Sequence, residues 1–298
     1  MARFGSVLTA MVTPFDVDGA LHEAEAAALA RWLVEQGNQG LVVAGTTGES
    51  PTLSHHEQGR MFQIVRDAVS VPVIAGVGSN NTAESLDLVR RAEAANVDGL
   101  LLVTPYYNRP SQAGLLRHFR TVAEATTLPV MLYDIPVRTG RKIDTATLLE
   151  LAHTVPNIVA LKDAAGDPGE TASFIARAPE GFEVYSGDDS LTLPFLSVGA
   201  VGVVGVATHW CAREMLDMVE SFQKGDVDRA RAVNAAMIGS YEFETGLIAP
   251  NPVPTKALLR AIGRPVGECR MPMGPTPDGW EDKAQQVLAD LRAAYSRI

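Results

Sequence analysis

Val130-Met131-Leu132-Tyr133 and Ile158-Val159-Ala160-Leu161-Lys162 are two apolar runs that together outline one repeat of the fold. Lys162 lies 29 positions after Tyr133. A strand–helix–strand unit takes about 30 residues. The spacing therefore predicts that the two residues end neighbouring parallel strands, at the same edge of one sheet.

Runs of this kind recur along the chain and alternate with segments of helical period. An uninterrupted apolar run is typical of a parallel strand buried on both faces. The predicted strands are Val7–Val12, Gly40–Ala44, Val71–Ala75, Gly99–Val103, Leu128–Tyr133, Ile158–Lys162, Phe182–Ser186 and Val201–Val206. The helical patterns between them include Glu23–Val34, Glu57–Val69, Ala83–Ala95 and Gln112–Ala125. Ser54, Thr82, Ser111 and Asp144 stand where helix N-caps are expected.

Eight strand–helix units predict an α/β protein with the TIM (β/α)8 barrel fold, which takes roughly 250 residues. The alternative is an open doubly wound sheet, which usually carries a glycine fingerprint in its first turn. Gly76-Val77-Gly78 lacks the third glycine, so the barrel is preferred. After about residue 225 the pattern turns helical, over Val227–Met237, Thr255–Ile262 and Asp278–Tyr295. We expect a barrel carrying the active site over residues 1–225 and a C-terminal helical region over 226–298.

Composition narrows the class of protein. The chain has 298 residues, 46% of them hydrophobic, and a formal net charge of −10. This sign argues against nonspecific binding to nucleic acid or to an anionic membrane. No export signal or membrane-spanning apolar stretch is evident, and Cys211 and Cys269 form no paired motif. We expect a cytoplasmic protein with free thiols.

Lys162 is the first candidate for chemistry. A strand lysine that faces an apolar interior loses hydration of its charged form, and its pKa falls. The neutral amine is a nucleophile, and a neighbouring tyrosine such as Tyr133 is a credible proton shuttle. The pair indicates Schiff-base chemistry on a carbonyl substrate. The alternative is a lysine that turns outward and pairs with Asp163.

Further candidates follow other predicted strands, where a barrel gathers its catalytic groups. Gly45–Ser50 places two hydroxyls between glycines, which suits either an anion-binding turn or a tight turn that caps the next helix. In Tyr106-Tyr107, at least one ring should face a cavity or a partner subunit. Arg138 offers a bidentate fork suited to a carboxylate. Asp188 and Asp189 are expected to cap a helix, and His55-His56 is not a metal site because adjacent histidines face different sides of a helix.

Five segments resemble those of the 4-hydroxy-tetrahydrodipicolinate synthase family, also called dihydrodipicolinate synthases. They match in order and spacing over nearly the whole chain: GTTGES (45–50), TPYYNRPSQ (104–112), YDIPVRTG (133–140), LKDAAG (161–166) and SGDD (186–189). The first segment and the lysine are shared by all pyruvate-dependent class I aldolases. Arg138 and the tyrosine segment are more specific, and they resemble the synthases rather than the sialic-acid lyases.

The resemblance implies a lyase that condenses pyruvate with L-aspartate 4-semialdehyde in lysine and diaminopimelate biosynthesis. No metal or organic cofactor is expected, because the imine itself activates pyruvate. By this resemblance the catalytic residues are Lys162, Tyr133, Thr46 and Tyr107, the last reaching in from a neighbouring subunit. The substrate-binding residues are Thr47, Arg138, Gly187 and the backbone at Val204. The implied assembly is a homotetramer built as a dimer of dimers.

The resemblance also suggests a regulatory site. Members inhibited by lysine bind it in a cleft between subunits, and five residues match that cleft: Ser50, His55, Asn80, Glu84 and Tyr106. The chain departs from the family pattern at Pro51 and Gln58, where alanine and histidine are usual, and at Gly205, where serine is more frequent.

Two other functions remain open at this stage. One is a pyruvate-dependent aldolase for a different aldehyde, such as a keto-deoxy sugar acid or 4-hydroxy-2-oxoglutarate aldolase. The other is a non-catalytic barrel that binds a keto acid, and it would tolerate loss of Lys162.

Overall fold

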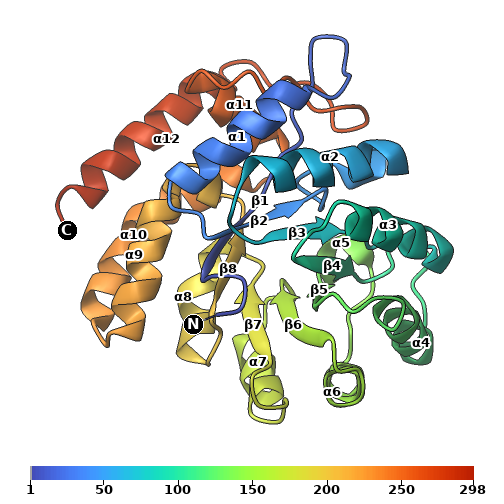
Figure 1. Ribbon diagram of the computed structural model, residues 1–298. Helices are drawn as coiled ribbons and strands as arrows, with labels where there is room; N and C mark the ends of the chain where they lie inside the picture. Colours follow the sequence, from blue (N-terminus) through green and yellow to red (C-terminus); the bar gives the residue numbers. More distant parts are fainter. Residues whose placement is uncertain (1) are drawn as a thin grey trace.

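The structure, a computed structural model, describes residues 2–298. Eight parallel strands close into a barrel in sequence order (Figure 1). They are β1 (Val7–Ala10), β2 (Gly40–Val43), β3 (Val73–Gly76), β4 (Gly99–Val103), β5 (Val130–Asp134), β6 (Ile158–Asp163), β7 (Glu183–Ser186) and β8 (Gly202–Gly205). Each predicted strand overlaps one of these, and β1 pairs with β8 to close the ring. The predicted TIM barrel is confirmed.

Helices surround the strands. Those of the barrel are α1 (Glu23–Glu35), α2 (His55–Ala68), α3 (Thr82–Ala94), α4 (Gln112–Ala123), α5 (Pro136–Thr139), α6 (Thr145–Thr154), α7 (Pro168–Ile175), α8 (Thr192–Ser197) and α9 (Thr208–Gln223). The chain then continues through α10 (Val227–Glu244), α11 (Val253–Ala261) and α12 (Trp280–Tyr295). Two single turns of 3₁₀ helix, Ser50–Thr52 and Asp189–Leu191, follow β2 and β7. Among these helices, none is long and apolar enough to cross a membrane.

Helix starts agree with the predicted caps in part. Ser54 and Ser111 accept backbone hydrogen bonds at the starts of α2 and α4, as predicted. Thr82 is instead the first helical residue of α3, because the side chain of Asn81 accepts the capping bond. Asp144 lies at the cap position of α6, but its side chain makes no capping bond.

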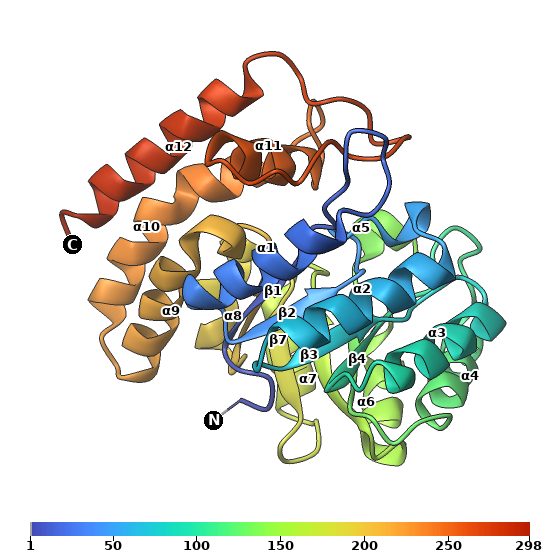
Figure 2. The ribbon, with the colours of Figure 1, turned by 45° about the horizontal axis from the view of Figure 1, so that its top comes forward.

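The C-terminal helices pack on one side of the barrel. α10 lies against α9 and α12, and α11 lies against α12 (Figure 2). One hydrophobic cluster joins Val7 of β1 and Val203 of β8 to Tyr241 of α10 and Leu291 of α12. The region after residue 225 therefore shares a core with the barrel, and the division at that residue stays a prediction.

Strand alternation decides which side chains face the barrel interior. Side chains two apart along a strand lie on the same face. Met131 and Ala160 belong to the interior cluster, which also contains Tyr133. Tyr133 and Lys162, each two positions further along its strand, therefore point inward at the C-terminal end of the barrel.

Candidate active site

Lys162 and Tyr133 meet at the mouth of the barrel. They are paired residues of β6 and β5, as the repeat length predicts. The Lys162 side chain is only 4% exposed, and its Nζ lies 4.5 Å from the centre of the Tyr133 ring. The alternative of an outward lysine paired with Asp163 is wrong, because that carboxylate accepts bonds from Thr171 Oγ1 and the Ala165 N–H.

The surroundings of Lys162 favour the neutral amine. The pKa of Lys162 falls from 10.5 to about 8, chiefly because burial disfavours the charged amine; the charge of Arg138 also lowers it, while Asp189 and Glu244 act in the opposite direction. With a pKa of about 8, about one amine in ten is neutral at pH 7. A useful fraction of the lysine is therefore already in the nucleophilic, neutral form at pH 7.

This pKa predicts the pH dependence of the first chemical step. Because only the neutral amine attacks a carbonyl, kcat/KM for pyruvate is expected to rise about tenfold per pH unit below the pKa. It should level off above pH 8. Steady-state rates from pH 6 to pH 9.5 in a constant-ionic-strength buffer measure this. A profile flat from pH 6 upward would contradict the assignment of the amine.

Tyr133 keeps its proton in the folded protein. Burial raises the pKa of this phenol to about 12, against the opposing effects of the Arg138 charge and a hydrogen bond with Thr46. A neutral phenol both donates and accepts a hydrogen bond. Tyr133 therefore has the protonation state that a proton shuttle needs.

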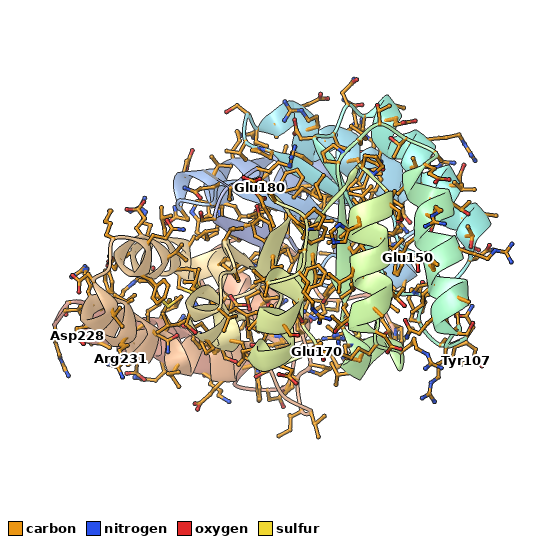
Figure 3. All side chains as sticks on the ribbon, turned by 90° about the horizontal axis from the view of Figure 1, so that it is seen from below. Tyr107, Glu150, Glu170, Glu180, Asp228 and Arg231 are labelled. Atoms are coloured by element: carbon orange, nitrogen blue, oxygen red, sulfur yellow. The ribbon has the colours of Figure 1, made fainter. Side chains whose placement is uncertain are left out.

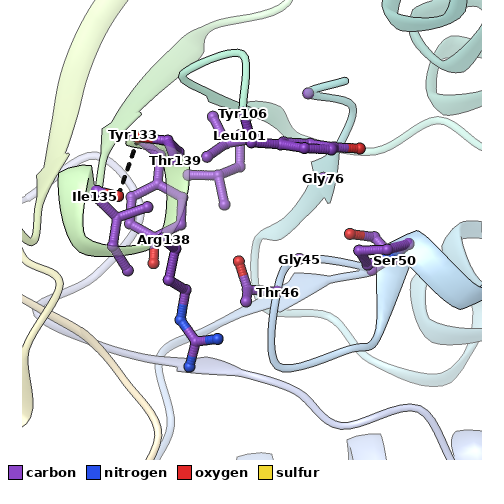
Figure 4. A pocket seen from close by; sticks show the side chains of 14 residues that line it. Gly45, Thr46, Ser50, Gly76, Leu101, Tyr106, Tyr133, Ile135, Arg138 and Thr139 are labelled. Atoms are coloured by element: carbon purple, nitrogen blue, oxygen red, sulfur yellow. Dashed lines mark hydrogen bonds between the residues drawn. The ribbon is translucent and has the colours of Figure 1, made fainter. Parts of the chain in front are cut away.

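The cavity around Lys162 holds about 190 Å³. Its lining brings together most of the predicted site: Thr46, Thr47, Tyr133, Arg138, Lys162 and Gly187. A second cavity shares three of these and extends toward Ser50 and Tyr106. In Figure 4, Thr46, Tyr133 and Arg138 gather on one side of it. The volume suits a small substrate such as a keto acid.

The turn after β2 holds the two threonines. Two backbone bonds close it, from the Glu49 N–H to the Thr46 oxygen and from the Ser50 N–H to the Gly45 oxygen. Asn251, just before α11, donates to Thr47 Oγ1 at 3.0 Å. The tight turn is confirmed, but neither Glu49 nor Ser50 caps α2, because Ser54 does so. The role of the turn in binding a carboxylate stays a prediction.

Two buried carboxyl groups lie beside Lys162, and only one of them had drawn attention in the sequence. Asp188 caps the turn after β7, as predicted. Asp189 does not serve as a cap: it accepts a bond from the Val206 N–H and is buried. Burial raises the pKa of Glu244 well above its usual value, and burial raises that of Asp189 also. Asp189 Oδ1 and Glu244 Oε2 have no other hydrogen-bond donor within the described chain. The raised pKa of Glu244 favours its protonated form, and that proton can be donated to the Asp189 carboxylate.

Glycines make room for these groups. A Cβ at Gly187 would lie 2.9 Å from Ala164 Cβ and 3.0 Å from Lys162 Cγ, so a side chain there would crowd the lysine. A Cβ at Gly205 would lie 2.3 Å from Asp189 Oδ1. The serine that is more frequent at position 205 in the family carries such a Cβ. Glycine at this position therefore leaves room for the Asp189 carboxyl group.

Other predicted residues lie outside the cavity. Tyr107 is 89% exposed and projects from the edge of the molecule (Figure 3). The side chain of Val204 packs in the barrel interior, and Val206 lines the cavity. Among the residues of the predicted lysine cleft, His55 pairs with Asp87, and Glu84 accepts from Ser79.

Sequence reasoning missed Glu244 and Asn251. Glu244 ends a helix far along the chain, and nothing in its neighbours distinguishes it from a surface glutamate. Asn251 offered a weak signal, since it stands between two prolines, Pro250 and Pro252. Only closure of the chain brings either residue to the β2 and β7 loops.

The chain is similar to known proteins over nearly its whole length. The model of the Dihydrodipicolinate synthetase family matches residues 3–294. A 4-hydroxy-tetrahydrodipicolinate synthase from Symbiobacterium thermophilum is 50% identical, covering 97% of this chain and 99% of the relative. A dihydrodipicolinate synthase from Bacillus anthracis superposes with a TM-score of 0.93 at 42% identity, covering 97% of this chain and 99% of the other. A DHDPS from Cyanidioschyzon merolae, solved with lysine bound, gives 0.95 at 40% identity, covering 98% and 99%.

Proposed function

We infer the reaction from one premise: the chain belongs to the dihydrodipicolinate synthetase family. It is a lyase that condenses pyruvate with L-aspartate 4-semialdehyde to 4-hydroxy-tetrahydrodipicolinate, in lysine and diaminopimelate biosynthesis. The observation that carries the mechanism is the buried Lys162 amine, with its lowered pKa, over the Tyr133 ring. The direct test is an assay of the purified protein with both substrates.

Lys162 forms the imine with pyruvate. The neutral Nζ attacks the keto carbon, and the carbonyl oxygen leaves as water, so that the lysine nitrogen becomes doubly bonded to carbon. Loss of a proton from the pyruvate methyl group gives an enamine, whose carbon attacks the aldehyde of the second substrate. The amino group of that substrate then closes the ring and displaces Lys162 as an amine.

Tyr133 moves the protons that these steps require. Its phenol is protonated, faces the cavity and is bonded to Thr46, which is the next member of the proposed relay. Tyr107 is the third member. Thr47 and the β8 backbone at Val204 hold the pyruvate carboxylate, and Gly187 lies on the same rim of the cavity.

Arg138 receives the carboxylate of the semialdehyde. It lines both cavities, and its guanidinium offers two parallel donors. We expect Arg138→Met to lower kcat/KM for the semialdehyde at least about tenfold, the scale of losing hydrogen bonds to a charged group. Since the Arg138 charge lowers the pKa of Lys162, the pH profile should also shift to higher pH.

The same variant separates this reaction from that of other aldolases. Steady-state kinetics with aspartate semialdehyde and with an aldehyde that lacks a carboxylate make the comparison. Arg138→Met should lose activity mainly with the former. An equal loss with both aldehydes, or equal use of both by the unmodified enzyme, would favour a different aldehyde substrate.

The protein is cytoplasmic, and its active unit is an oligomer, either a dimer or a dimer of dimers. The loop that carries Tyr107 supports the oligomer: Asn108 donates to the Asn80 oxygen and Arg109 donates to the Gly140 oxygen. The loop is therefore fixed while the Tyr107 ring projects outward, as a side chain lent to a neighbour requires.

Lysine inhibits the enzyme at a second site near Ser50 and Tyr106. Both residues line the cavity that adjoins the active site, and His55, Asn80 and Glu84 belong to the same proposed set. We expect millimolar lysine to lower the rate in the assay of both substrates, with arginine as the control. Even a weak site, with a Kd of about 1 mM, would be mostly occupied at about 10 mM lysine. Unchanged activity at that concentration would therefore reject the site.

A further inference from the structure

Glu49 and Lys256 form a buried ion pair that the reaction does not use. Lys256 Nζ lies 2.6 Å from Glu49 Oε1, and the side chains are 0% and 1% exposed. Glu49 belongs to the turn that carries Thr46 and Thr47, whereas Lys256 belongs to α11 of the C-terminal region. A charge buried at this depth persists only with a partner and further hydrogen bonds.

Both groups have those further bonds. Lys256 Nζ donates to the Glu268 carbonyl at 3.1 Å and lies 4.1 Å from the centre of the Phe15 ring. The other carboxylate oxygen of Glu49 accepts from the Arg270 N–H at 2.8 Å. The guanidinium of Arg270 lies on the Phe15 ring as well, at 4.2 Å.

Arg270 extends the contact along the turn. Its guanidinium donates to the Thr52 carbonyl at 2.9 Å and pairs with Glu57 at 2.6 Å. The turn from Gly45 to Thr52 is thus fixed at two points by residues more than 200 positions later in the chain. α11 lies beside α1 (Figure 2), and Asn251, just before α11, contacts Thr47 of the turn.

The backbone of the turn needs such an anchor. Glu49 has a φ of 57° and Ala44 a φ of 52°, and neither is glycine. A left-handed residue with a side chain persists only where its surroundings impose it. The Glu49 carboxylate, held between Lys256 and the Arg270 N–H, supplies that restraint at one end of the Thr46–Thr47 pair.

Lys256 is not a second nucleophile. It does not line either cavity at the barrel mouth, and its amine is engaged by a carboxylate, a carbonyl and an aromatic face. Its amine contacts Glu49 of the turn, the Glu268 carbonyl and the Phe15 ring rather than the space that a substrate would fill.

We propose that Lys256 and Arg270 are positioning residues, which act through Glu49 and Thr52 to hold Thr46 and Thr47 in their productive orientation. The inference rests on the proposed function. Lys256 and Arg270 thereby take part in pyruvate binding without lining the cavity that the substrate fills. A displacement of about 1 Å at a substrate-positioning group costs about a hundredfold in rate.

Paired substitution tests the anchor. Lys256→Met alone leaves the Glu49 carboxylate buried without its cation, which strongly destabilises the fold, so Lys256→Met is combined with Glu49→Gln. The double variant removes both charges at nearly constant volume. Arg270→Gln is the second variant, since it releases Thr52 while the ion pair stays intact.

We expect both variants to fold, by circular dichroism and melting temperature, and to raise KM for pyruvate about tenfold or more with a smaller fall in kcat. A purely structural role would lower the fraction of folded enzyme and thus Vmax, and would leave KM unchanged. Glu281→Gln is the matched control, because it breaks an ion pair of Arg260, on α11, that does not touch the turn. It should leave KM unchanged.

The outcomes are distinct. A folded double variant or a folded Arg270→Gln enzyme with the pyruvate KM of the unmodified protein would overturn the proposal. If the double variant does not fold, Arg270→Gln decides. Borohydride reduction of the unmodified enzyme with pyruvate tests the proposed function separately: if Lys162 is not labelled there, that function fails whatever the variants do.

Discussion

Lys162→Ala is expected to abolish covalent capture of pyruvate and to lower kcat at least about a thousandfold. The reason is that the imine nitrogen comes from this amine alone, and losing a covalent nucleophile removes the whole intermediate path. The variant should fold, because it takes a costly buried amine out of the barrel mouth. The chain has only five lysines, so the capture site is easily mapped.

Borohydride reduction with pyruvate, followed by peptide mass mapping, is the measurement. The unmodified protein should gain the mass of one reduced pyruvate adduct on the peptide with Lys162, and the variant should gain none. Lys224→Ala is the matched control, since this side chain is on the surface and pairs with Glu220. Labelling of Lys256 or any other lysine in place of Lys162 would overturn the mechanism.

Tyr133→Phe is expected to lower kcat about 10²- to 10⁴-fold, which is the range for loss of a general acid–base group. The ring is retained, so packing in the barrel interior and the burial of Lys162 should hardly change. The pH midpoint near 8 should therefore persist while the rate of imine formation falls. A large shift of that midpoint would show that the phenol acts on the lysine pKa rather than on proton transfer.

Rapid-quench borohydride trapping measures the imine rate directly. Tyr185→Phe in β7 is the matched control: this tyrosine is also buried, but its phenol donates to Glu183 at the opposite end of the barrel. Its trapping rate should match that of the unmodified enzyme. An unchanged trapping rate in Tyr133→Phe would exclude the phenol from imine formation.

The strand–helix repeat in the sequence determined the barrel fold and placed Tyr133 beside Lys162. A parallel strand needs a short apolar run, and a crossover helix needs a segment of helical period, so both are visible locally. With one repeat of about 30 residues, Tyr133 and Lys162 had to end neighbouring strands. Alternation along each strand then placed both on the interior face.

Only the tertiary structure decided the partners of the site. The pairing of Glu244 with Asp189 and of Lys256 with Glu49 joins residues that no local pattern relates. A glutamate or lysine in a helix has the same sequence signature whether it faces water or a buried partner. Its environment is fixed when the C-terminal helices close over the barrel, because burial and charge pairing are properties of the assembled chain rather than of any segment of it.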